Sequence, residues 1–84
     1  MIWSPDRLVE LKALQTAGIY KHEEIANFFR TKYQSHVNEG IVKNTLRSQK
    51  NELSKIEMTD DDVKVFVANN PDYLTQKETQ KERF

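Results

Sequence analysis

Residues 40–50 read GIVKNTLRSQK, and this stretch combines two kinds of side chain in a helical pattern. At about 100° per residue, a helix over residues 39–53 would gather its inward side in a narrow arc formed by Val42, Leu46, Gln49 and Leu53. The opposite side would be polar, with Lys43 and Lys50 on its flank, and would carry Gly40, Asn44, Arg47, Ser48 and Asn51. The segment is therefore amphipathic: one side suits a protein core, and the other suits an acidic ligand such as DNA.

A first helix is predicted near the amino terminus. Ser4-Pro5-Asp6 is typical of a helix start, because serine caps, proline tolerates the first turn and an acid suits the positive end of the helix dipole. Ala17-Gly18 would end this helix after Thr16, since glycine adopts the left-handed conformation at little cost. Its apolar side would consist of Leu8, Val9, Leu11 and Leu14.

A second helix is predicted over residues 21–34. Its apolar stripe follows helical spacing, with Phe28 at the edge, and consists of His22, Ile25, Ala26, Phe29 and Tyr33. Residues 35–38 interrupt the pattern, and Asn38 fits the cap of the helix that follows. Three short helices with a basic outer side on the third match the layout of a helix-turn-helix DNA-binding domain.

A further helix is predicted to start at Thr59, where the acids at 60–62 suit a capped helix start better than a divalent cation site. It would end at Asn69-Asn70-Pro71, because the residue before proline avoids the helical region. Its apolar residues would pack onto the core or form a surface for a homodimer or a protein partner; they are Val63, Phe66 and Val67. A polar tail, frayed or weakly helical, would follow Asp72.

The whole-chain composition fits this plan. The 84 residues include only two Gly and two Pro, which favours an all-α fold: a three-helix helix-turn-helix bundle with an additional C-terminal helix and a polar tail. Residues 1–56 carry nine Lys or Arg against six Asp or Glu, a net +3, and residues 57–84 carry four against seven, a net −3. This asymmetry predicts a basic binding domain at 1–56 and an acidic helix and tail at 57–84.

Several functional classes are excluded or disfavoured. The chain has no cysteine for a disulfide or a cysteine zinc site, and His22 and His36 alone do not make one, so we expect no metal or cofactor. No apolar run is long enough for a membrane helix or a secretory signal. We therefore expect an intracellular protein, in the nucleus if eukaryotic and in the cytoplasm if bacterial or viral. No catalytic constellation is evident, so we do not expect an enzyme.

Several spacings agree with one known family. Trp3 precedes the first helix, Gly18 is followed by His22 and Ile25-Ala26, and the third helix contains Val42-Lys43-Asn44. Over residues 3–51 the chain resembles a single Myb/SANT-type, homeodomain-like repeat. His22 and Leu46 stand where the family has its second and third tryptophans, and residues 25–42 are several residues longer than in a typical repeat. The resemblance implies that Lys43 and Asn44 contact base edges.

The resulting hypothesis is a small sequence-specific binder of double-stranded DNA, acting as a transcriptional regulator or a DNA-processing accessory factor. Arg47 lies one turn beyond Lys43 and would join the base readers. The DNA backbone would be contacted by a wider set: Gly40, Ser48, Lys50, Asn51, Arg30, Lys32 and Lys55. The alternative is a SANT-like adaptor that binds proteins rather than DNA.

Overall fold

Five helices make up the described part of the chain. A computed structural model describes residues 2–74, which contain no strand; the helices are α1 (Pro5–Ala17), α2 (His22–Tyr33), α3 (Glu39–Ser48), α4 (Lys50–Ser54) and α5 (Asp60–Asn69). The predicted all-α fold is confirmed. None of these five helices combines the length and the hydrophobicity that crossing a bilayer requires. From residue 75 onward, the predicted polar tail lies outside the described residues.

The predicted helix ends are set by local caps. Asn38 Oδ1 accepts the backbone N–H of Ile41 at 2.8 Å and so begins α3. Thr59 Oγ1 accepts the N–H of Asp62 at 3.1 Å, and the Asp62 carboxylate accepts the N–H of Thr59 at the same distance. Gly18, at φ 71°, ends α1 in the left-handed conformation. These caps confirm the boundaries that the sequence indicates.

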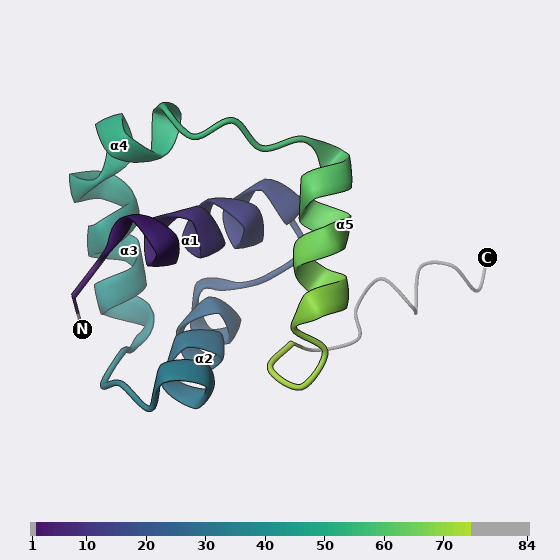
Figure 1. The fold of residues 1–84 in the computed structure, drawn as a ribbon. Coiled ribbons are helices and arrows are strands. Elements are labelled where there is room, and N and C mark those ends of the chain that lie inside the picture. Colours follow the sequence, from purple (N-terminus) through teal and green to yellow (C-terminus); the bar gives the residue numbers. More distant parts are fainter. Residues whose placement is uncertain (1, 75–84) are drawn as a thin grey trace.

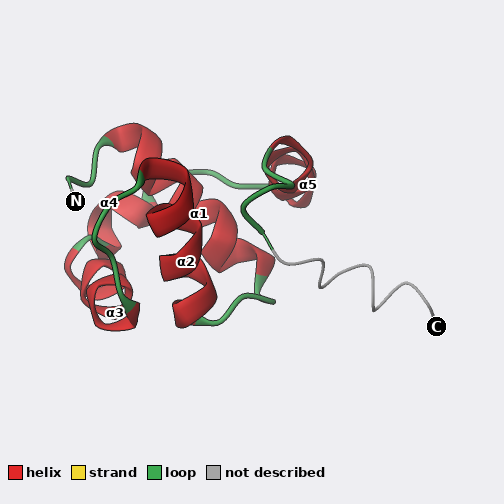
Figure 2. Ribbon diagram, turned by 90° about the horizontal axis from the view of Figure 1, so that it is seen from below, coloured by secondary structure: helices red, strands yellow, loops and turns green. Residues whose placement is uncertain are grey.

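The helices surround one core. In Figure 1, α1 crosses the middle of the molecule, with α3 and α4 on one side of it and α5 on the other, and Figure 2 shows the same separation of α5 from below. α1 packs against α4 and α5, and α2 packs against α3. Trp3 meets the Phe29 ring edge-on at a centroid distance of 5.0 Å, as expected of a core anchor. The buried core consists of Leu8, Leu11, Leu14, Ile25, Ala26, Phe28, Phe29, Val37, Val42 and Leu53.

Phe28 lies deeper than its predicted place at the edge of a stripe. Its side chain is fully buried, whereas Val9, predicted on the apolar side of α1, is 44% exposed. The Phe28 ring meets Phe66 at a centroid distance of 5.5 Å and Tyr73 at 6.0 Å. The reason for the difference is that α5 and the turn after it cover a side of α2 that a three-helix layout leaves open.

α5 is joined to the same core as the other helices. Phe66 packs against the buried cluster, and Val63 and Val67 are half-buried on the same side of the helix. Two roles were possible for these three residues: packing onto the core, or forming a surface for a second copy or a partner. Their positions fit packing onto the core. The outward side of α5 carries Val65 instead, which is 58% exposed.

The predicted helix over residues 39–53 is divided into two. Gln49 leaves helical geometry at φ −102° and ψ 20°, so that α3 ends at Ser48 and α4 starts at Lys50. The turn sends α4 in a new direction (Figure 1) and brings Leu53 into the core, where α4 packs against α1. The single-helix prediction was wrong at Gln49, where no glycine or proline marks a break, although the helical period placed Leu53 correctly on the inward side.

Candidate nucleic-acid interface

The exposed side of α3 carries the predicted base-reading residues. Val42 on its inward side is fully buried and Thr45 is 5% exposed, which fixes which way the helix faces. The residues on the other side are all exposed: Gly40, Lys43, Asn44, Arg47 and Ser48. We call these five residues the α3 face. The structure thus brings together the predicted base readers and two of the predicted backbone contacts.

A buried residue and a hydrogen bond just before the helix hold α3 in this orientation. Thr45 is satisfied in its buried position because its hydroxyl donates to the Ile41 carbonyl at 2.8 Å. Before the helix, Val37 is buried in the core, and its carbonyl accepts a hydrogen bond from Arg30 Nη1 at 2.9 Å. The connection between α2 and α3 is therefore tied to α2 by a side chain as well as by the chain itself.

Asn44 and Arg47 are free to meet a ligand. Within residues 2–74, neither side chain makes a hydrogen bond or an ion pair. Lys43 makes one weak contact, an ion pair with Glu39 at 3.9 Å, in which both side chains are about half exposed. The α3 face therefore offers amide, guanidinium and ammonium groups that no neighbour in the described chain holds firmly.

The predicted phosphate contacts divide into two groups. Lys50 and Asn51 are exposed on α4, and Lys55, which caps the C-terminal end of that helix, is exposed as well and lies 3.6 Å from Glu52. Arg30 is occupied by the Val37 carbonyl and by Glu23, at 3.1 Å. Arg30 is therefore better described as a residue that supports α3 than as one that reaches outward.

Lys32 belongs to a polar cluster away from α3. Its Nζ lies 2.5 Å from Glu10 Oε2 on α1 and 2.9 Å from Asn70 Oδ1 at the end of α5. The Tyr33 hydroxyl also donates to Glu10. Burial, followed by this hydrogen bond, raises the pKa of Tyr33 to about 12. Lys32 thus links three helices and lies outside the α3 face.

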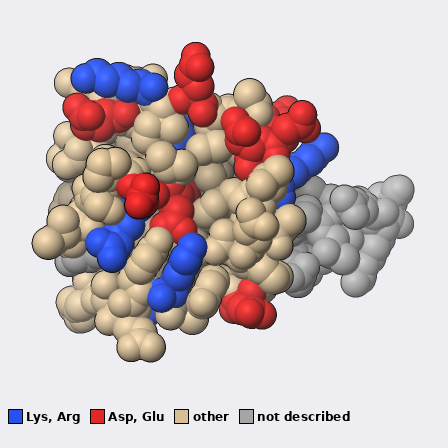
Figure 3. Space-filling model, viewed as in Figure 1, with Lys and Arg blue, Asp and Glu red and all other residues tan. Residues whose placement is uncertain are grey.

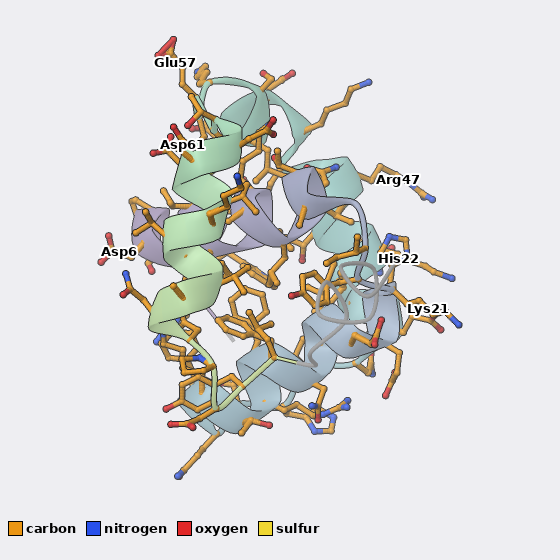
Figure 4. All side chains as sticks on the ribbon, turned by 90° about the vertical axis from the view of Figure 1, so that its right-hand side faces the viewer. Asp6, Lys21, His22, Arg47, Glu57 and Asp61 are labelled. Atoms are coloured by element: carbon orange, nitrogen blue, oxygen red, sulfur yellow. The ribbon has the colours of Figure 1, made fainter. Side chains whose placement is uncertain are left out.

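The side chains labelled in Figure 4 lie on two sides of the molecule, although Lys and Arg side chains also appear on the side that carries the labelled acids (Figure 3). In Figure 4, Arg47, Lys21 and His22 lie on one side, whereas Asp6, Asp61 and Glu57 lie on the other. Figure 3 shows acidic side chains gathered over the start of α5, on the face opposite Arg47. The structure therefore places Lys21, the N-cap of α2, on the same side as Arg47, although the first turn of α2 also carries Glu23 and Glu24. Sequence reasoning missed Lys21 because only the packing of α2 against α3 places it there.

Two other features of the described chain are not part of this surface. A shallow cavity of about 260 Å³ lies between α2 and the turn after α5, and it is lined by Glu23, Glu24, Asn27, Arg30, Tyr73 and Leu74. Among residues 2–74, no three His, Asp or Glu side chains come together as metal ligands would. Neither feature competes with the α3 face as a candidate site.

Comparison of the chain with family models, curated proteins and solved structures gave no match. The geometry of the α3 face therefore carries the functional argument.

Proposed function

We propose that this protein binds double-stranded DNA in a sequence-specific manner by placing α3 in the major groove, as a small transcriptional regulator or a DNA-processing accessory factor. The observation that carries the proposal is the free state of Asn44 and Arg47 on a helix whose opposite side is buried. The resemblance to Myb/SANT-type repeats in the Val42-Lys43-Asn44 stretch supports the same proposal. No catalytic role forms part of it.

The chemistry of the α3 face matches base edges. Arginine and lysine donate to guanine O6 and N7, and asparagine pairs with adenine N6 and N7 in bidentate fashion. Asn44 and Arg47 lie three positions apart and so project from adjacent turns of α3. An α-helix with its side chains is about 10–12 Å across, which fits a major groove about 12 Å wide.

Other groups would position the protein without reading sequence. Lys50 and Asn51 on α4, Lys55 just after it and Lys21 at the N-cap of α2 are exposed and would contact phosphates beside the groove. Gly40 exposes the backbone of the first turn of α3, where the positive end of the helix dipole favours a phosphate.

The adaptor alternative has less support. Its predicted surface consisted of Val63, Phe66 and Val67; all three are half-buried, and Phe66 packs against the core. In addition, the α3 face is basic, whereas SANT-type domains that bind basic protein tails would be expected to present acids there.

The decisive experiment is a DNA-binding titration. The parent protein should shift random-sequence duplex at low salt, and selection from a random pool should yield a preferred site. Asn44→Ala and Arg47→Ala should each weaken binding to that site by about 1–3 kcal/mol. Lys64→Ala, which removes an exposed lysine from α5, is the matched control and should change little. If both α3 variants bind the preferred site as tightly as the parent protein, Asn44 and Arg47 do not read bases.

A further inference from the structure

Glu39 stands at the start of the helix proposed to enter the groove. It is the first residue of α3, its side chain is 51% exposed, and its carboxylate lies 3.9 Å from Lys43 Nζ, one turn further along. Residues near the N-terminus of a recognition helix are the ones that meet base edges. An acid at this position suits the positive end of the α3 dipole, but beside DNA, a polyanion, it would have a further effect.

A carboxylate beside DNA has two opposite effects. Phosphates repel it, so it weakens binding to every sequence. In the major groove, however, it can accept a hydrogen bond from the cytosine N4 amino group. The carboxylate therefore lowers the affinity for DNA in general and restores it only where a suitable amino group is present. A binding site can thus discriminate through repulsion as well as attraction.

The pairing of Glu39 with Lys43 sharpens this expectation. The two groups place one acceptor and one donor side by side at the outer surface of α3. The major-groove edge of a G·C pair presents the complementary arrangement, with two adjacent acceptors at guanine N7 and O6 beside a donor at cytosine N4. In an A·T pair the donor at adenine N6 lies between the two acceptors, so no two acceptors adjoin for the ammonium group. The ion pair is long and exposed, so Lys43 is held weakly and can turn toward guanine at little cost.

Resting on the DNA-binding function proposed above, we infer that Glu39 is a specificity-determining residue: it accepts from cytosine N4 at a G·C pair whose guanine is met by Lys43, and it suppresses binding to other sequences. The base pair is thus recognised by the two side chains together.

The test compares Glu39→Gln with Glu57→Gln. Both changes remove one exposed carboxylate with the same chemistry, but Glu57 lies on the opposite side of the molecule from Arg47 (Figure 4). Anisotropy titrations would use random-sequence duplex, the selected duplex, and the selected duplex with each G·C pair exchanged for A·T, at two salt concentrations.

Glu39→Gln should bind random-sequence duplex about threefold to tenfold more tightly, with a salt dependence steeper by up to about one unit. Its preference for one G·C pair should fall about tenfold. Glu57→Gln should change neither quantity. Glu39→Asp keeps the charge but shortens the reach, so it should leave random-sequence binding unchanged and still lose the preference.

The outcomes separate the two proposals. If the parent protein binds no duplex even at low salt, the proposed function fails and this inference fails with it. If the parent binds and discriminates but Glu39→Gln behaves like Glu57→Gln, the inference about Glu39 alone is overturned.

Discussion

Arg30 Nη1 donates to the carbonyl of Val37 at 2.9 Å and so ties α2 to the residue just before the cap of α3. Val37 is itself buried, so its side chain and its carbonyl are both fixed. The direction in which the α3 face points therefore depends on a side chain that does not belong to that face.

Replacing Arg30 with methionine should lower the free energy of unfolding by about 1–2 kcal/mol, because the Val37 carbonyl loses a charged donor. Urea unfolding would measure the change. Glu23→Gln is the matched control: it removes only the exposed ion pair to Arg30 and should cost less than about 0.5 kcal/mol. Equal losses in the two variants would mean that the hydrogen bond to Val37 contributes nothing beyond the ion pair.

Gly40→Ala should separate stability from binding. The added Cβ would lie 3.4 Å from Asn38 Oδ1, a distance that needs little adjustment, and alanine stabilises a helix over glycine by about 0.5–1 kcal/mol. Thermal unfolding should therefore show a more stable protein. DNA titrations should show weaker binding if the backbone of the first turn approaches a phosphate. A more stable variant with parental affinity would contradict that close approach.

Phe66→Ala should destabilise the protein by about 2–3 kcal/mol. Its ring packs against Phe28 at a centroid distance of 5.5 Å, and the value is below that for a fully buried ring because Phe66 is half-buried. Val65→Ala, one position earlier and mostly exposed, should stay within about 0.5 kcal/mol of the parent. Similar small effects at both positions would show that α5 contributes little to the stability of the core.

Lys50→Ala should weaken binding to all DNA sequences alike and lower the magnitude of the salt slope by about one. Lys50 is exposed on α4, outside the α3 face, and would contact phosphate only. The measurement is affinity at several salt concentrations for the selected and the random duplex. A change in base preference, with the slope unaltered, would instead assign Lys50 to the base readers.

Stability should fall at high pH because of Tyr33. Burial, aided by the hydrogen bond to Glu10, raises the pKa of this side chain from 10.0 to about 12. The folded state therefore keeps a proton that the unfolded state loses. The contribution is fully present below pH 10.0 and is lost as the pH rises toward about 12. Unfolding at successive pH values should show this decline, and Tyr33→Phe should reduce it; an identical decline would assign it to other groups.

Local signals predicted the parts of the fold that are locally determined. Asn38, Thr59 and Gly18 cap helices through contacts within a few residues, so their roles follow from sequence alone. The full burial of Phe28 does not, because it arises from packing against Phe66, which is distant in sequence, and no glycine, proline or capping pattern marks the break at Gln49.

The same distinction applies to the candidate site. The exposure of Asn44 and Arg47 follows from the period of one helix and the burial of Val42. The partners of Lys32 lie 22 and 38 positions away in sequence, and no pattern in the chain links them. A lysine held in a polar cluster and a lysine free for phosphate therefore look alike until the helices are packed.

The break at Gln49 has a consequence for how the protein would find its targets. A helix of ten residues, about 15 Å long, spans about four base pairs at roughly 3.4 Å each. A sequence of about four base pairs recurs by chance roughly once in a few hundred base pairs, which is far too often to specify a unique site in a genome. The occupancy of a DNA region by monomers of this protein would then follow the local density of such short sequences. Regions in which they cluster would act as the effective target.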